Sequence, residues 1–459
     1  MKIICPRLWL AARATTAVLL ATLTGLASAR ATTKAAGVTS AAQPPVAGGL
    51  TLKSDPRLTL RVGAQRLVLE GGLQPSMVCT AKGTLVVQAQ ITDKPQPSKR
   101  ISYPSAIKTV VSRDHGDTWV EFPRPPGENG LNFEGGVIQL RSGRLLALDT
   151  YITPGPGDGA GLGQRFVSDD DWRTLAGPEE NFFRLPNVNF YGSTDDYGRS
   201  HVAVRLHRRM VELPNGDLLA TVYGWFKGDE TPVPYLRTLW KTRAFLVRSS
   251  DQGRHWRLVN TIAVDPVGTV EGCAEPVLVR ISSGPHAGRL RCYMRTGGDL
   301  LETWSDDEGA NWVAPRAVAF GVVDVHRTQD WAELFRGVTD KAGKPVDLVG
   351  NLVDPDVIEL RSGVLVCAVG ARIPARACWP RAGAARNGDY LAFSLDHGET
   401  WSHVVQLTSG VLTTHYMAIE ETPVDNEMFV TYDLGDWSSG QGRSIYGRPL
   451  RLEVAAAGR

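Results

Sequence analysis

The sequence predicts an all-β chain folded as a six-bladed β-propeller, and three observations predict it. From Leu58 onward, short strand-like runs alternate with Gly, Pro, Asn and Asp residues, while helical periodicity is scarce. An eight-residue motif with the pattern S-x-D-x-G-x-T-W recurs along the chain. A second pattern, which predicts the first strand of a repeating unit, returns about every 70 residues. Self-similarity at such intervals is typical of repeat architectures, and six four-stranded units of this size fit a propeller.

The eight-residue motif predicts a hairpin turn tied to a core aromatic residue. The Asp side chain can accept hydrogen bonds from nearby backbone N–H groups, Gly tolerates positive φ, and the Trp opens the next strand and buries a large ring. The copies are residues 112–119 and 394–401, which match at every position, then 249–256, 305–312 and a degenerate, shortened 168–172. We expect these turns to be structural and to face outward. Their tryptophans, expected to be buried, are Trp119, Trp256, Trp312 and Trp401.

The second repeat predicts where each unit begins. A polar residue leads into an apolar run, and a turn Gly follows nine residues after the polar one. The polar residues are Gln74, Glu134, His207, Glu275 and Asp354, with a sixth copy at His415-Tyr416 that lacks the Gly. Between each turn Gly and the next motif there is room for two further strands, so each unit holds about four strands. A two-sheet sandwich is the alternative, but it would not repeat so regularly.

In a propeller, the inner strands begin at one mouth of the central channel, so their first polar residues meet there. Any one of these residues alone is most simply a solvated strand end, whereas a whole ring of them indicates a binding site. The residues expected to bind substrate in this ring are Gln74, Glu134, His207, Asp354 and His415. Two long insertions, about 173–204 and 322–350, are expected to rim the same mouth.

The N-terminus predicts export from the cytoplasm. Basic residues precede an apolar run from Ala17 to Ala27, and Ala27-Ser28-Ala29 is typical of a cleavage site, so residues 1–29 are expected to be a signal peptide. A membrane anchor is the alternative, but the apolar run is short for a span. Cleavage near Ala29 would leave a secreted or periplasmic protein. Residues 30–55 are expected to be a disordered linker, and residues 58–455 the propeller.

The charge balance, the apolar runs and the cysteines indicate which partners, disulfides and metals to expect. The chain has 50 basic and 48 acidic side chains, and this balance gives no indication of a nucleic-acid partner. No second apolar run is long enough to cross a membrane. Cys5 leaves with the signal peptide, and Cys367–Cys378 is the pair most plausibly bridged among the five that remain. No metal-binding motif is present, so neither a metal nor a cofactor is expected.

With these repeats, residues 58–455 resemble the sialidase (neuraminidase) superfamily, whose Asp-box motifs decorate a six-bladed propeller. The resemblance implies three arginines that hold a substrate carboxylate, a Tyr nucleophile paired with a Glu, and an Asp acid/base. Glu275, which starts an inner strand, fits the family Glu, and Arg295 fits the arginine on the next strand. Arg386, eight residues before a motif Ser, is similar to the third arginine, and Arg372 competes for that role.

The nucleophile and the acid depend on finer alignment. Tyr416 resembles the family nucleophile, although strict repeat alignment places His415 there, and Asp93 is a possible acid/base. The main departure from the family lies in the first unit, which has Leu73-Gln74-Pro75 where family members carry an arginine. Without this arginine, the site lacks one set of charge-assisted hydrogen bonds to the substrate carboxylate. The third unit offers substitutes, which are Arg205, Arg208 and Arg209.

The resemblance implies an exo-acting glycoside hydrolase on terminal, acidic sugars of glycans. A carboxylate nucleophile would be repelled by the carboxylate of a sialoside, whereas a phenol activated by a Glu is not. One alternative is a polysaccharide lyase or uronate glycosidase on the same fold, with His207, His415 or Tyr416 as base and acid. Another is a non-enzymatic propeller that binds glycans or proteins.

Overall fold

The computed structural model describes residues 51–95, 105–123, 131–192, 202–322, 337, 350–373, 386–410, 414–435 and 443–455. These residues are mostly β-strands, and they include two short 3-10 helices, η1 (Phe133–Gly135) and η2 (Gly284–His286). The predicted all-β class is therefore confirmed. No helix within these ranges is long and apolar enough to cross a membrane.

The N-terminal predictions fall almost entirely outside this part of the chain. The expected signal peptide, residues 1–29, and the expected linker up to residue 50 lie outside the described residues. Thr51–Lys53, within the range expected to be linker, forms β1 and pairs with β28 (His403–Gln406). The first strand therefore begins before the expected start at residue 58.

Four sheets of four or five strands contain only antiparallel neighbours. One sheet consists of β4 (Leu73–Cys79), β5 (Leu85–Pro95), β6 (Ser105–Ser112) and β7 (Val120–Phe122). Another consists of β21 (Ala274–Arg280), β22 (Leu290–Arg295), β23 (Leu301–Ser305) and β24 (Arg316–Ala317). The third joins β1 and β28 to β25 (Asn351–Glu359), β26 (Leu365–Arg372) and β27 (Gly388–Ser394). The fourth consists of β2 (Leu58–Val62), β3 (Arg66–Glu70), β29 (Met417–Glu421), β30 (Glu427–Leu434) and β31 (Ser444–Val454).

An eleven-stranded sheet contains two further runs of four antiparallel strands. One run is β8 (Val137–Gln139), β9 (Leu145–Leu148), β11 (Ala160–Ser168) and β12 (Ala176–Arg184). The other is β15 (Val211–Glu212), β16 (Leu218–Phe226), β19 (Arg243–Ser249) and β20 (His255–Ala263). The two runs meet because β12 and β20 pair in parallel. The remaining strands are β10 (Tyr151–Pro154), β13 (Val188–Asn189) and β14 (Val204–Leu206), and a separate hairpin is formed by β17 (Pro232–Val233) and β18 (Leu236–Trp240).

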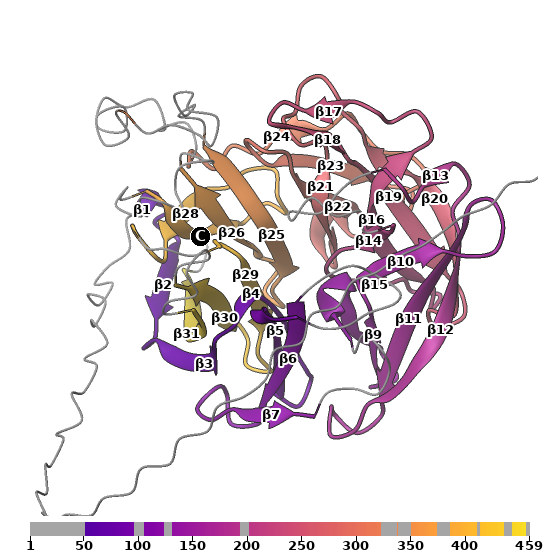
Figure 1. Ribbon diagram of the computed structural model, residues 1–459. Helices are drawn as coiled ribbons and strands as arrows, with labels where there is room; N and C mark the ends of the chain where they lie inside the picture. The colour runs from indigo at the N-terminus through magenta and orange to yellow at the C-terminus, as the bar shows by residue number, and fades with distance from the viewer. Residues whose placement is uncertain are drawn as a thin grey trace, which may run out of the picture. The chain divides into compact units, whose positions relative to one another are not determined.

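The sheets are arranged like the blades of a propeller around a common centre (Figure 1). Strand β21 contacts β25, β25 contacts β29, and β29 contacts β4, so the first strands of successive sheets line this centre. Within the sheets, burial decreases toward the outer strand: β26 and β27 are almost wholly buried, whereas the outer strands β7 and β24 are exposed. The second strand, β2, pairs with the last strand, β31, so segments from near the two ends of the described chain share one sheet.

The hydrophobic core lies between the sheets. One apolar cluster joins Val277 and Tyr293 of one sheet to Val357 and Trp401 of the next, and similar clusters lie between other neighbours. Because a single sheet cannot bury both of its faces alone, each depends on its neighbours for stability.

The repeated motif forms a turn between the third and fourth strands of a unit. In the copy after β27, Asp396 Oδ1 accepts from Ser394 Oγ and from the Thr400 N–H, each at 2.8 Å. His397 and Gly398 carry positive φ of 57° and 89°, which is why Gly stands at the second position. Thr118, in another copy, donates to Asp114 and holds the pKa of that carboxyl at about 2. The expected structural turn is observed.

The expectation that all four motif tryptophans are buried is only half right. Trp256 and Trp401 are buried, whereas Trp119 and Trp312 are only partly buried. Trp119 and Trp312 precede short outer strands that are themselves exposed, so less of the chain covers them. Trp172, in the degenerate copy, is almost fully buried.

The prediction of a Cys367–Cys378 bridge is wrong. Cys367 is a free thiol inside β26, and burial raises its pKa well above the usual value. Cys378 lies outside the described residues. A strand this deeply buried keeps the thiol among apolar neighbours.

Candidate active site

The inner strands begin with a shared backbone feature. Gln74, Glu275, Asp354 and His415 all carry positive φ, between 45° and 65°, although none is glycine. In β4, β21 and β25 the pairing register shifts at this point, as in a β-bulge. A bulge re-aims a side chain, and non-glycine residues with positive φ gather at functional sites. The predicted ring therefore coincides with a repeated local distortion.

Three predicted residues meet at the centre. The phenol of Tyr416 donates to Glu275 Oε1, and Arg295 Nη1 lies 2.8 Å from the same oxygen and 3.2 Å from Tyr416 Oη. The second oxygen, Glu275 Oε2, accepts from the Asp354 N–H at 2.9 Å. The three side chains come from the starts of β21 and β29 and from the end of β22. Tyr416, and not His415, has the register that reaches Glu275.

Electrostatics polarise this group. Burial raises the pKa of Glu275, but the charges of Arg295 and His207 and the hydrogen bond from Tyr416 outweigh it, so the pKa falls to about 2. Burial and the charge of Glu275 raise the pKa of Tyr416 well above its usual value. At neutral pH the pair therefore consists of a carboxylate and a neutral phenol, held by one guanidinium.

Arg295 has a second carboxylate partner that the sequence reasoning missed. Its Nε and Nη2 donate to the two oxygens of Glu271, at 2.7 and 3.2 Å. Tyr235, between β17 and β18, donates its phenol to Glu271 Oε1 at 2.7 Å. Glu271 lies outside the repeat positions and Tyr235 lies in an inserted hairpin, so no periodic signal marked either.

Arg372 lies at the site, whereas no described contact brings Arg386 there. The guanidinium of Arg372 lies 5.6 Å from the centre of the Tyr416 ring, and its Nη2 donates to the Thr414 carbonyl at 2.9 Å. The described contact of Arg386 is its carbonyl, which accepts from Tyr390 Oη at 2.5 Å. Arg372 ends β26, the strand that contacts β29, and this position explains the difference.

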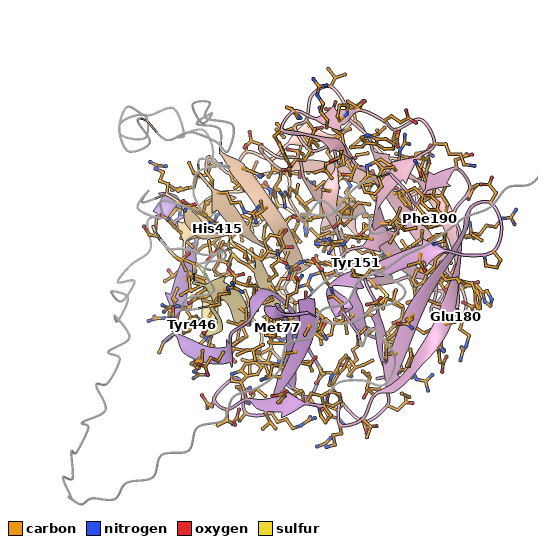
Figure 2. The ribbon with its side chains drawn as sticks, in the orientation of Figure 1. Met77, Tyr151, Glu180, Phe190, His415 and Tyr446 are labelled. Carbon is orange, nitrogen blue, oxygen red and sulfur yellow. The ribbon has the colours of Figure 1, made fainter. Side chains whose placement is uncertain are left out.

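Glu134, His207 and Asp354 form a second polar group. His207 is fully buried, with Nε2 3.4 Å from Asp354 Oδ1 and 3.9 Å from Glu134 Oε1. Glu134 Oε2 accepts from Arg205 Nη2 at 2.9 Å. The Arg205 guanidinium also lies over the Tyr151 and Tyr223 rings, and Figure 2 labels Tyr151 near the centre of the sheets.

Arg208 and Arg209 bind carboxylates on neighbouring strands of the protein. Arg208 Nε donates to Asp354 Oδ1 at 3.0 Å and its Nη2 to Asp354 Oδ2. Arg209 donates to both oxygens of Asp356, at 2.6 and 2.9 Å, and to Glu420 at 3.1 Å. Both arginines therefore tie the loop before β15 to β25 and β29. The suggestion that they could replace the missing first arginine is not supported by these contacts.

Gln74, His415 and Asp93 are the remaining predicted residues. The Gln74 N–H donates to Asp433 Oδ2 at 2.8 Å, and Asp433 Oδ1 also accepts from the Thr414 N–H at 2.8 Å. His415 is buried. Its carbonyl lies so close to Gly370 that any side chain at position 370 would collide with it. Asp93 belongs to β5, but its side chain lies outside the described residues.

The arrangement brings together a phenol, a carboxylate and a fixed positive charge, which are groups that nucleophilic group transfer can use. Within the described ranges, no group of three or more His, Cys, Asp or Glu residues is placed to hold a metal ion.

The repeated turns and the propeller-like arrangement define a protein built from Asp-box repeats. The family model described as the BNR repeat-like domain matches residues 138–411, which is more than half of the chain. The chain therefore belongs to the BNR repeat-like domain family, and the resemblance to the sialidase-like repeat superfamily is confirmed at this level. A comparison with curated proteins finds no match.

Solved structures share the fold. A protein of unknown function from Dyadobacter fermentans is 16% identical, with 87% of this chain and 100% of that chain covered and a TM-score of 0.55. An α-L-arabinofuranosidase from Fusarium graminearum is 10% identical, with 85% and 98% covered and a TM-score of 0.51. An α-L-arabinanase from Penicillium chrysogenum is 13% identical, with 88% and 98% covered and a TM-score of 0.50. At these identities the likeness concerns the fold alone.

Proposed function

We propose that the chain is an exo-acting, sialidase-like glycoside hydrolase in which Tyr416 is the nucleophile and Glu275 its base. One observation carries the proposal: the Tyr416 phenol donates to Glu275 Oε1, while Arg295 Nη1 contacts both groups. A nucleophile with its base in hydrogen-bond contact, oriented by a third group, is the signature of covalent catalysis. The fungal arabinofuranosidase and arabinanase support the general class, since hydrolases of glycans use this fold.

The reaction proceeds in two balanced steps. Tyr416 Oη attacks the anomeric carbon, the glycosidic C–O bond breaks, and the phenol proton passes to Glu275. An acid, for which Asp93 remains the candidate, protonates the departing oxygen. Water then attacks the anomeric carbon of the tyrosyl intermediate and gives one proton back to the acid, while the proton on Glu275 returns to the phenol as the bond to Tyr416 breaks. Because the pKa of Glu275 is about 2 and that of Tyr416 is raised, the proton transfer must accompany C–O bond formation.

We also propose the number of blades, the export of the protein and the class of its substrate. The two four-strand runs of the large sheet, counted with the four smaller sheets, support a propeller of six blades. We propose that the protein is exported, with residues 1–29 removed. A terminal acidic sugar such as sialic acid is the substrate that the family resemblance implies. Assays on 4-methylumbelliferyl glycosides of sialic acid, uronic acids and neutral sugars test that choice.

The central experiment compares Tyr416→Phe with His415→Ala on the substrate that this panel selects. Tyr416→Phe keeps the ring and loses only the attacking oxygen, so kcat should fall roughly 10³-fold or more while the fold persists. His415→Ala should be milder. Tyr432→Phe is the matched control, because it removes a phenol bonded to Gln65 Oε1 at 2.8 Å, outside the site.

The opposite outcome would reject the assignment. If His415→Ala is inactive and Tyr416→Phe keeps the full rate, a histidine acid/base as in a lyase or uronate glycosidase takes its place. If no glycoside in the panel is cleaved, a binding function is favoured instead.

A further inference from the structure

The donors of Arg295 are almost fully committed within the protein. A guanidinium has five N–H groups. Nε and Nη2 donate to Glu271, and Nη1 reaches both Glu275 Oε1 and Tyr416 Oη. Four of the five are thus engaged: Glu271 occupies the Nε/Nη2 edge, which binds a carboxylate at two points, and Glu275 and Tyr416 occupy Nη1.

Glu271 is held firmly in that position. Its N–H donates to the Thr296 carbonyl at 2.7 Å, and its own carbonyl accepts from the Thr242 N–H at 3.1 Å. The next residue, Gly272, has a φ of 86°, and any side chain there would collide with the Thr242 backbone. Tyr235 fixes the carboxylate from the other side. Backbone and side-chain bonds together therefore aim Glu271 at Arg295.

The geometry points to Glu271 as a specificity-determining residue that competes with the carboxylate of an acidic sugar for Arg295. The inference rests on the proposed function for the place of the sugar, beside Tyr416. A bidentate arginine–carboxylate pair is specific as well as strong, so an acidic sugar must displace Glu271 to form one. A neutral sugar needs no such displacement, so Glu271 weakens the binding of acidic sugars relative to neutral ones.

Two other arginines near the centre are also bound to carboxylates of the protein. Arg205 is paired with Glu134, and Arg208 with Asp354. Glu271 therefore acts through the arginine that contacts both Glu275 and Tyr416, which makes it a positioning residue for Arg295 and a selector of substrate charge.

The test compares the binding of matched sugars to the full chain and to Glu271→Gln. D-glucuronic acid and D-glucose differ only in the carboxylate, and N-acetylneuraminic acid adds a second acidic probe. Dissociation constants are measured by NMR titration at fixed salt. Glu271→Gln should bind both acidic sugars about tenfold more tightly and leave D-glucose unchanged, because Gln keeps the shape and loses the competing charge.

Tyr235→Phe provides a second, milder variant if Glu271→Gln folds poorly. It keeps the charge of Glu271 and removes only the bond that orients it, so acidic sugars should gain a smaller advantage. A purely structural role would weaken all three sugars equally. Unchanged or weaker binding of the acidic sugars, or no detectable binding to either protein, overturns the inference. These measurements do not need turnover, so they separate its failure from failure of the proposed hydrolase activity.

Discussion

At the scale of single residues, Glu420 shows how burial changes a carboxyl group inside this fold. Arg209 lies 3.1 Å away, and an ion pair alone would lower the pKa of Glu420. Burial outweighs that attraction because Arg209 is shared with Asp356, and the pKa of Glu420 rises from 4.5 to about 7. The proton is therefore retained in the folded protein over a pH range in which the unfolded chain has lost it.

Glu420→Gln should remove this pH dependence. Between pH 4.5 and about 7 the unfolded chain releases the proton and the folded protein holds it, so Glu420 lowers stability as the pH rises. We expect the variant to lose less in Tm than the wild type between pH 4.5 and 8. Thermal unfolding at several pH values measures this, with the exposed Glu121→Gln as control. Parallel curves for Glu420→Gln and the wild type would show that Glu420 titrates normally.

Residues at repeat positions could be predicted from the sequence, and residues outside the repeat could not. Glu275 starts an inner strand, so periodicity placed it at the centre. Strict periodicity placed His415 rather than Tyr416 in the last unit, and the choice of Tyr416 and of Arg295 came from the resemblance to the sialidase superfamily. Glu271 reaches Arg295 from outside the repeat pattern. Arg372 and Arg386 are both near strand ends, and only the contact between β26 and β29 separates them. Side-chain pairing across sheets has no linear signature.

At the scale of the element, the turn motif stabilises a sheet by joining a hydrogen-bonded turn to a packed ring. Trp401 is buried between Tyr293 and Phe320, with ring centres 5.8 and 5.2 Å away in edge-to-face geometry. The sequence predicted the turn because its Asp and Gly act locally. It did not predict which tryptophans are covered, because that depends on the length of the following strand and on the neighbouring sheet.

Trp401→Ala should lower the free energy of unfolding by roughly 3–5 kcal/mol, since it leaves a large cavity in a packed core. Trp312→Ala changes the equivalent position of another copy, where the ring is only partly buried, and should cost less. Chemical denaturation of both variants gives the comparison. Equal stability of Trp401→Ala and the wild type would contradict the core role of the motif.

At the scale of the whole molecule, strand pairing and hydrogen bonds join units that lie far apart in the chain. Strand β2 pairs with β31, and Arg208 and Arg209 link the loop before β15 to β25 and β29. The repeat predicted the strands within each unit, but not these contacts between units. Nor did it predict that β12 and β20 pair in parallel, because each copy of a repeat describes only its own unit.

The most direct test of the account is to identify the residue that carries a covalent glycosyl intermediate. The protein is incubated with a fluorinated, slowly released derivative of the glycoside it cleaves, digested, and mapped by mass spectrometry. The account predicts one labelled peptide with the sugar on Tyr416, and no label in Tyr416→Phe. A sugar attached to Glu275, or sustained turnover by Tyr416→Phe without any label, would contradict it.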